Sequence, residues 1–355
     1  MIKIAQSART LKRILKLLDE QLRDSRTLAI ILHNNPDPDA LAAGVALQTL
    51  AESLYNVRSR CFYGGMINRA ENEKMVKLLG IAVEPFVAEQ IQACDRIALV
   101  DTLPGRGNNP LPADQECHLI FDHHFHDGHF RTGILIYSRQ VGATATLLAE
   151  LLIAAGVEIR SDLATALIYA IRTETQELRR EAHPRDRQVY LKLFPLSSVQ
   201  KIGEIAYPRL PHSYFVTLSA ALQKALVFRR IMVVGLETVP LPEIVAELAD
   251  FFLRYERISW VLVMGGYEGY VYFSLRTIHP EGRAFRILQK ILDDRINAGG
   301  HETYAGGRLP RGERSFAELE RQILERTPQI LGYTAAKVQW RPILQGMKTN
   351  QKVFQ

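Results

Sequence analysis

The chain has 355 residues, of which 47% are hydrophobic and 23% are charged, and its formal net charge is +6. This length favours two domains over a single core, and the composition is that of a soluble globular protein. No run approaches the ~18 to 20 apolar residues of a membrane span, and three scattered cysteines without a CxxC pair indicate reduced thiols in a cytoplasmic protein. The mild excess of positive charge suits a polyanionic partner, but it is as common in metabolic enzymes.

The first half of the chain alternates between predicted strands and helices. Apolar residues at helical spacing and the lack of a signal-peptide pattern predict an amphipathic helix near the N-terminus, carried by Leu11, Ile14, Leu15, Leu18 and Leu22. Hydrophobic patterning predicts strands at 27–33, 57–63, 96–102 and 117–124, and helices at 39–54, 71–80 and 142–156. This alternation is typical of an open, mostly parallel α/β sheet.

A second, smaller α/β domain is predicted after a helix-rich stretch. It has expected strands at 228–237, 259–267 and 270–277, helices at 241–253 and 284–295, the glycine-rich run AGGHETYAGGRLP and a further helix. We therefore divide the chain into a first domain (1–205), a linker (206–227), a second domain (228–340) and a tail (341–355). We expect a cleft between the two domains.

Polar side chains follow three of the predicted strands at the point where each strand ends. They are His33, Asp37 and Asp39 in LAIILHNNPDPD, Asp101 in RIALVD, and Asp122, His123 and His124 in HLIFDHH. The carboxyl ends of strands in an open α/β sheet are where ligands gather. Taken singly, Asp39 could cap the helix that follows it and DHH could be a hydrogen-bonded turn. Their joint placement favours one shared site.

Such a site requires cations, because several carboxylates packed together repel one another. Carboxylate oxygens and imidazole nitrogens without thiolate favour manganese or magnesium. Asp37 and Asp39 are two positions apart in a loop and can face different ions, and Asp101 could bridge both. Two metal ions ~3.5 to 4 Å apart polarise a phosphoryl group and activate water. The pattern therefore predicts hydrolysis of a phosphate ester.

The motifs HNNPDPDA, VDT, FDHH and GGH occur in an order that resembles the DHH phosphoesterase family over most of the chain. This family includes RecJ-type exonucleases, nanoRNA nucleases that also dephosphorylate 3′-phosphoadenosine 5′-phosphate, cyclic-dinucleotide phosphodiesterases and family II pyrophosphatases. The resemblance implies that 1–205 is a DHH catalytic domain and that 228–340 is the DHH-associated domain, which binds substrate. It also implies two divalent cations, with Mn²⁺ preferred and Mg²⁺ or Co²⁺ as substitutes.

The same resemblance assigns roles to the strand-end residues. The first cation would be held by His33, Asp37 and Asp101, and the second by Asp39, Asp101 and His123. His124 would face the scissile phosphate, and Asp122 would orient an imidazole from behind the ligands.

A fourth family motif departs from its usual form. The family reads G-I-x-T-D-T and supplies an aspartate to the second cation, whereas ALIYAIRTETQELRR has Glu174 at that position and Ala170 in place of the glycine. We retain Glu174 as a predicted ligand, whose extra methylene shifts the geometry or weakens the second site. Glu177 is better explained as a solvated charge.

In the second domain, the resemblance assigns substrate binding to Arg276 in YFSLRT and to Gly299, Gly300 and His301 in AGGHETYAGG. Arg276 would reach a nucleotide phosphate or base, and the two glycines would let the backbone approach a phosphate. From the residues alone, Arg276 shares a strand face with Ser274 and could be a solvated edge, and GGH could be a turn.

Two further features are interpreted as structural. The start of the helix at 142–156 is mainly packing, with Thr144 capping it or touching a ligand. A basic cluster after the fourth motif indicates an exposed helix face rather than a strand-binding groove, and it consists of Arg179, Arg180, Arg185 and Arg187.

The sequence therefore predicts a phosphoesterase that hydrolyses short oligonucleotides or 3′-phosphonucleotides with two-metal-activated water. We expect short single-stranded oligonucleotides or nucleotides as partners, and no association with a membrane. A homodimer is the expected oligomeric state. Size favours the nanoRNA nuclease or 3′-phosphoadenosine 5′-phosphate phosphatase branch. A catalytically silent nucleotide-binding regulator that uses the same cleft, or a cyclic-dinucleotide phosphodiesterase, is the alternative.

Overall fold

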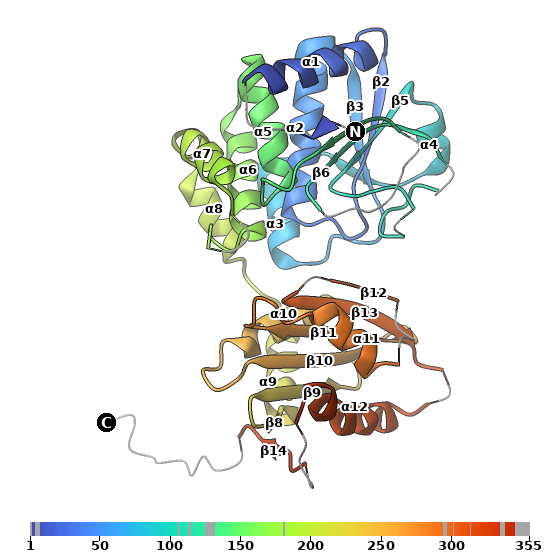
Figure 1. The fold of residues 1–355 in the computed structure, drawn as a ribbon, viewed down its shortest axis with the longest axis vertical. Coiled ribbons are helices and arrows are strands. Elements are labelled where there is room, and N and C mark those ends of the chain that lie inside the picture. The colour runs from blue at the N-terminus through green and yellow to red at the C-terminus, as the bar shows by residue number, and fades with distance from the viewer. Residues whose placement is uncertain are drawn as a thin grey trace. The chain divides into compact units, whose positions relative to one another are not determined.

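The structure is a computed structural model that describes residues 2–3, 8–105, 107–112, 115–124, 132–179, 182–293, 297–300, 302–312, 314–333 and 338–344. The chain divides into two compact units, Met1–Arg209 and Leu210–Gln355. Each unit consists of one sheet and its own helices (Figure 1). The predicted α/β fold with a second α/β unit is confirmed.

The first unit contains a seven-stranded sheet in the order β1-β7-β6-β5-β2-β3-β4. All neighbouring strands run parallel. The strands are β1 (Ile2–Lys3), β2 (Thr27–Ile31), β3 (Arg58–Tyr63), β4 (Val83–Pro85), β5 (Arg96–Val100), β6 (Cys117–Asp122) and β7 (Thr132–Tyr137). The predicted parallel sheet is confirmed, and β1, β4 and β7 lie outside the predicted strands. The carboxyl ends of β2, β5 and β6 meet at one edge of the sheet, since these strands are adjacent and parallel.

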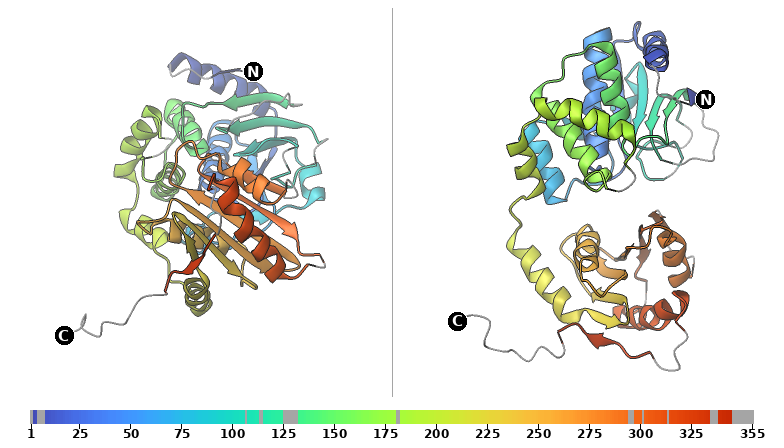
Figure 2. Two further views of the ribbon diagram at one scale, coloured as in Figure 1. Left: turned by 60° about the horizontal axis from the view of Figure 1, so that its bottom comes forward. Right: turned by 60° about the vertical axis from the view of Figure 1, so that its left-hand side comes forward.

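Helices and loops cover both faces of this sheet, as near-continuous apolar strands require. On one face α2, α5 and α6 pack side by side (Figures 1 and 2), and α4 with the loop around Leu103 and Leu111 covers the other. The helices of this unit are α1 (Ala8–Leu22), α2 (Pro38–Tyr55), α3 (Ala70–Leu79), α4 (Ala88–Gln92), α5 (Thr144–Ala155), α6 (Ser161–Glu174), α7 (Pro184–Leu193), the short η1 (Phe194–Leu196) and α8 (Val199–Ala206).

The second unit contains a mixed sheet in the order β12-β13-β11-β10-β9-β8-β14. Its strands are β8 (Leu226–Phe228), β9 (Ile231–Leu236), β10 (Trp260–Tyr267), β11 (Tyr270–Thr277), β12 (Asn297–Gly300), β13 (Tyr304–Pro310) and β14 (Arg341–Pro342). Only β9 and β10 pair in parallel among these neighbours. One face packs on α11 (Ala284–Ile291) and α12 (Phe316–Ile330), and the other on α9 (His212–Lys224) and α10 (Ile244–Leu253).

The segment 206–227, predicted as a linker, contains α9 and the first two residues of β8, and the division between the units falls between Arg209 and Leu210. The helix is part of the second unit because its buried Ala221 packs among the core residues next to β9. The predicted tail begins with β14, which pairs with β8, and 345–355 lie outside the described residues. None of the helices that the structure describes is long and apolar enough to span a membrane.

Candidate metal centre

The end of β2 and the start of α2 position His33 and Asp37. Asp37 is the N-cap of α2, and its Oδ1 accepts hydrogen bonds from the backbone N–H groups of Asp39 and Ala40 at 2.9 and 3.0 Å. Capping holds this carboxylate in a fixed orientation at the positive end of the helix. His33 Nε2 lies 3.5 Å from Asp37 Oδ1, so the two side chains face the same point.

Asp101 follows β5 in a left-handed backbone conformation, with φ of 58°. This region is sparsely populated by residues other than glycine, and outliers of this kind cluster at functional sites. The Asp101 N–H donates to the carbonyl of Phe121 in β6 at 2.9 Å, which ties the turn to the neighbouring strand. The carboxylate is almost fully buried, and its Oδ2 lies 3.7 Å from His33 Nε2.

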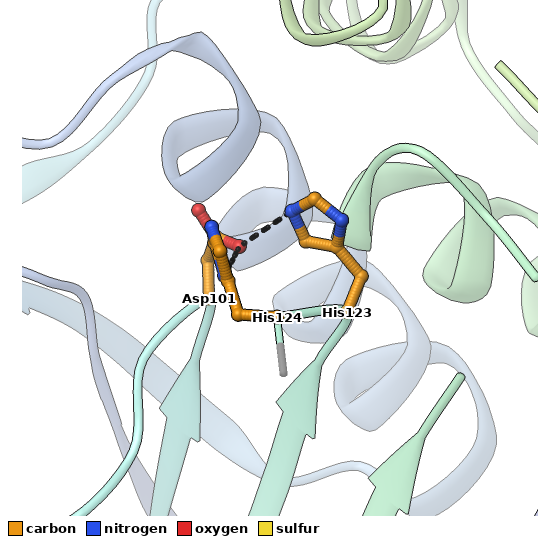
Figure 3. A group of neighbouring side chains, drawn as sticks. All are labelled: Asp101, His123 and His124. Atoms are coloured by element: carbon orange, nitrogen blue, oxygen red, sulfur yellow. Dashed lines mark ion pairs between the residues drawn. The ribbon is translucent and has the colours of Figure 1, made fainter. Parts of the chain in front are cut away.

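The end of β6 brings His123 and His124 to the same carboxylate. Figure 3 shows both imidazoles turned toward Asp101, whose Oδ1 lies 3.6 Å from His123 Nε2 and 3.6 Å from His124 Nδ1. Asp122, the last residue of β6, is buried, and its Oδ1 accepts from the His124 backbone N–H at 3.0 Å and lies 2.9 Å from His124 Nδ1. Asp122 thus fixes the ring of His124.

Two groups of potential ligands result, and they share Asp101. One comprises His33, Asp37 and Asp101, and the other comprises Asp101, His123 and His124; the ligand atoms of each lie within 4.8 Å of one another. The contacts of 3.5 to 3.7 Å are too long for hydrogen bonds. They fit two atoms bonded to one cation at about 2.1 Å each, which can lie at most about 4.2 Å apart. The donor set of carboxylate and imidazole therefore fits a hard or borderline divalent cation.

Asp39 lies beside the second group. Its Oδ2 is 3.8 Å from His123 Nε2, but both of its oxygens accept backbone N–H groups at the start of α5, from Thr144 at 2.7 Å and from Ala145 at 2.8 Å. The alternative reading of Asp39 as the cap of the helix that follows it is wrong, because Asp37 caps that helix. Asp39 instead stabilises the N-terminus of α5, a helix that is distant in sequence.

Thr144 connects the carboxylates of Asp39 and Asp101. While its backbone N–H donates to Asp39, its hydroxyl donates to Asp101 Oδ1 at 2.8 Å, and its side chain is fully buried. The sequence predicts mainly packing at the start of α5, with a capping or ligand-touching role for Thr144. The small-residue run GATAT is the signal that permits this close approach of the α5 N-terminus.

Glu174 is the last residue of α6 and is half-buried. Its carboxylate is close enough to contribute to raising the pKa values of Asp39 and His124, so it lies within electrostatic reach of the second group. Glu177 is engaged elsewhere, because Arg172 donates to both of its oxygens at 2.7 and 2.8 Å.

Proton affinities in the cluster reflect the mutual influence of these charges. Burial raises the pKa of Asp101 to about 6, and burial with nearby carboxylates raises the pKa of Asp39 well above its ordinary value. Burial lowers the pKa of His33, but Asp37 and Asp101 outweigh it and raise that pKa to about 9. Burial also opposes the charged form of His124, whose pKa its carboxylate neighbours nevertheless raise to about 10. Without a cation, bound protons reduce the repulsion between the carboxylates.

The second unit places its predicted residues on β11 and β12. The Arg276 Nε donates to Asp250 Oδ1 at 2.6 Å, and the guanidinium lies 5.5 Å from the centre of the Tyr304 ring. Arg276 is therefore held in place and is not a freely solvated edge. Gly299 is exposed with open space where a side chain would lie, and a Cβ at Gly300 would meet the Tyr304 carbonyl at 2.4 Å. His301 lies outside the described residues.

The prediction of an exposed basic helix face is wrong for Arg185, which is 2% exposed, while Arg179 and Arg187 are exposed and Arg180 lies outside the described residues. Arg185 donates to both oxygens of Glu150 and to the Ser138 hydroxyl. Asp186, next to it, is fully buried. The proline at the first position of α7 marks the start of this helix, so that Arg185 and Asp186 lie in its first turn.

Fold and side-chain cluster together define a two-unit α/β protein with a candidate metal centre at strand ends. Residues 27–171 match the family described as DHH family, N-terminal domain. The chain is 31% identical over 308 residues to an uncharacterized protein of Methanocaldococcus jannaschii, covering 85% of this chain and 62% of that protein.

It is also 27% identical over 182 residues to the probable manganese-dependent inorganic pyrophosphatase of Deinococcus radiodurans, covering 50% of this chain and 57% of that protein. The match thus spans 62% and 57% of the length of these two relatives. In fold, the chain is similar to an exopolyphosphatase-related protein from Bacteroides fragilis. The TM-score is 0.73 at 14% identity, over 92% of this chain and 98% of that one.

Proposed function

We propose that the protein is a metal-dependent hydrolase of phosphate esters that acts on short linear oligonucleotides, on 3′-phosphonucleotides or on both. One observation carries the proposal: His33, Asp37, Asp101, His123 and His124 converge from three strand ends into two ligand groups that share Asp101. The DHH-family match over 27–171 and the manganese dependence in the name of the Deinococcus relative support the same chemistry.

Two divalent cations, Mn²⁺ in preference to Mg²⁺ or Co²⁺, would supply activation of water and of the phosphoryl group at this edge. His33, Asp37 and Asp101 would hold one of them. Asp101 and His123 would hold the other, with Asp39 or Glu174 completing the set. Because both Asp39 oxygens already accept N–H groups from α5, Asp39 would share its lone pairs between a cation and that helix.

The other residues of the site would act on the substrate. Asp122 fixes the ring of His124, and the His124 side chain is 33% exposed, so this imidazole would donate a hydrogen bond to the phosphate as charge develops on it. The second unit would supply Arg276 for a second phosphate or a base. The open backbone at Gly299, together with the neighbouring Gly300 and His301, would allow a close approach to phosphate.

The finer assignments rest on the motif resemblance. We place the protein in the nanoRNA nuclease or 3′-phosphoadenosine 5′-phosphate phosphatase branch, with its second unit as the DHH-associated, GGH-containing domain. A cytoplasmic location and a homodimeric state stay predictions.

The test is a manganese-dependent hydrolysis assay on pApA, a five-residue oligoribonucleotide, 3′-phosphoadenosine 5′-phosphate, cyclic di-AMP and pyrophosphate in parallel. We expect release of mononucleotide or phosphate from the linear substrates, and its loss in Asp101→Ala. Preferential cleavage of cyclic di-AMP or pyrophosphate would move the protein to another branch. No turnover on any substrate with Mn²⁺ bound would contradict the proposed activity.

One observation favours a second candidate, a nucleotide-binding protein without turnover. Glu174 stands where the family motif has aspartate, and its longer side chain changes the position of the carboxylate at the second ligand group. Tight nucleotide binding without product release, together with turnover restored by Glu174→Asp, would identify this case.

A further inference from the structure

Arg185 and Asp186, both in the first turn of α7, are buried to an extent that is unusual for charged residues. Their side chains are 2% and 0% exposed, and Arg185 is among the largest fully buried side chains of the described chain. A buried charge is costly unless it is paired and hydrogen-bonded. Here both are satisfied by residues from other elements.

Asp186 accepts three hydrogen bonds. Its Oδ2 accepts from the His183 N–H at 2.7 Å, which is the usual capping-box bond within α7. It also accepts from the Gly142 N–H at 2.8 Å, and Oδ1 accepts from the Thr146 hydroxyl at 2.6 Å. The last two bonds exceed what capping α7 requires, because they reach Gly142, in the segment that joins β7 to α5, and Thr146, in the first turn of α5.

Arg185 holds the same segment at two further points. Its Nη1 donates to the Ser138 hydroxyl at 2.8 Å, and its Nε donates to Glu150 of α5 at 2.9 Å. Ser138 is in turn linked to the strand end, because its N–H donates to the Asp122 carbonyl at 3.3 Å. The start of α7 therefore fixes the β7–α5 connection from its first residue to the second turn of α5.

The opposite side of this connection faces the candidate metal centre. Gly142 and Thr146, which Asp186 holds, flank Thr144 and Ala145. The N–H groups of Thr144 and Ala145 orient both oxygens of Asp39, and the Thr144 hydroxyl orients Asp101. Residues 142–146 thus donate hydrogen bonds to the Asp186 carboxylate on one side and to the predicted ligands Asp39 and Asp101 on the other.

We propose that Asp186, supported by Arg185, is a positioning residue of the metal centre: it fixes the α5 N-terminus so that Asp39 and Asp101 are held ready for cations. This inference rests on the proposed function, since it assigns Asp39 and Asp101 to cation binding. Asp186 lies outside the motifs of the sequence. Its hydrogen bonds hold the start of α5, and the start of α5 in turn hydrogen-bonds Asp39 and Asp101. Partners of metal ligands that set their orientation change metal affinity by about 10- to 100-fold when removed.

The test measures Mn²⁺ binding to metal-free protein by isothermal titration calorimetry, alongside thermal unfolding. The variants are Asp186→Ala, Asp186→Asn and Thr146→Val, with circular dichroism to verify folding. Ser198→Ala is the matched control, because Ser198 caps α8 of the same unit through a bond from the Lys201 N–H and contacts no predicted ligand. All titrations are run well below the unfolding temperature of every variant.

We expect Asp186→Ala to raise the Kd for Mn²⁺ by about 10-fold or more, and Thr146→Val to raise it by a smaller factor. Asp186→Asn should retain most of the affinity, because an amide can accept from an N–H through its oxygen while the Thr146 hydroxyl turns to accept from its nitrogen. Ser198→Ala should lower thermal stability without changing the Kd. If Asp186→Ala does not fold, Thr146→Val decides the question.

An unchanged Kd in the folded variants, with stability lowered as in Ser198→Ala, would overturn the inference and leave only a structural cap. The binding measurement separates this inference from the proposed activity. A wild-type protein that binds Mn²⁺ but hydrolyses none of the offered substrates would contradict the proposed function, while the comparison of Kd values would still decide the role of Asp186.

Discussion

Replacement of Thr144 by valine removes one hydroxyl from the centre of the site and little else. The hydroxyl donates to Asp101 Oδ1 at 2.8 Å in a fully buried position, and the backbone N–H that serves Asp39 is unaffected. A buried hydrogen bond to a charged group contributes about 1.5 to 3 kcal/mol. For a unit of this size, each 1 kcal/mol changes the Tm by about 2 to 4 °C. The metal-free first unit should therefore unfold about 3 to 12 °C lower at pH 8.

The effect should depend on pH, because the hydroxyl stabilises the ionised form of Asp101. The folded-state pKa of this group is raised from 3.8 to about 6, so the wild type loses stability as pH rises from about 4 to 6. Loss of the hydroxyl donor should raise the pKa of Asp101 further. The variant should therefore go on losing folding stability as the pH rises above 6. The difference between variant and wild type should accordingly be larger at pH 8 than at pH 5.

Thr49→Val is the matched control for this comparison. Its hydroxyl donates only to the Val45 carbonyl within α2 at 2.9 Å, and we expect a change within about 0.5 kcal/mol. Thermal unfolding of the three proteins in EDTA, followed by circular dichroism at pH 5 and pH 8, provides the measurement. A Thr144→Val shift no larger than that of Thr49→Val at pH 8 would refute the proposed link between the α5 N-terminus and Asp101.

Three other outcomes follow from the same geometry. Mn²⁺ at 100 times its Kd should stabilise the first unit by about 2.7 kcal/mol per site, and EDTA should reverse this; an unchanged Tm would argue against a preformed site. Because the pKa of His33 is about 9 without metal, Mn²⁺ must displace a proton below that pH, so calorimetric affinity should rise from pH 6.5 to 8.5; a flat profile would exclude His33 as a ligand. Arg276→Ala should raise KM for the linear substrate about 10-fold with little change in kcat. Asp250→Asn, which removes the partner charge of Arg276, should not raise KM, and a fall in kcat alone for Arg276→Ala would contradict a binding role.

Much of the fold could be predicted because the central strands have distinct patterns. The runs around Ile30, Ala98 and Ile120 are apolar because both faces of the sheet are covered. The helices α3 and α5 end at clear glycine C-caps. The edge strands β1 and β4 escaped prediction because two or three residues carry no periodicity. The helix α9 falls in the predicted linker because helical patterning does not show which unit a helix packs against. Its Ala221 belongs to the core of the second unit, and its Leu218 and Leu222 pack against that core.

The candidate site also has a part that could be predicted from the sequence and a part that could not. Strand ends and motif order were sufficient to nominate the residues that surround Asp101, since neighbouring parallel strands must deliver their ends to one edge. The hydrogen bonds from Thr144 to Asp39 and Asp101 depend on how α5 approaches the sheet. The burial of Asp186 depends on how α7 packs against α5. Such contacts between elements distant in sequence have no local signature, and two adjacent charges in a polar helix are typical of an exposed face.

Metal stoichiometry decides whether Asp101 is shared between two cation sites. Purified protein would be stripped with chelator, titrated with Mn²⁺, and analysed by calorimetry and electron paramagnetic resonance beside Asp101→Ala. If Asp101 bridges two cations, each wild-type chain should bind two Mn²⁺ ions with the spectrum of a coupled pair, and both sites should be weaker in the variant. A single uncoupled ion in the wild type, or two ions bound equally well without the Asp101 carboxylate, would contradict it.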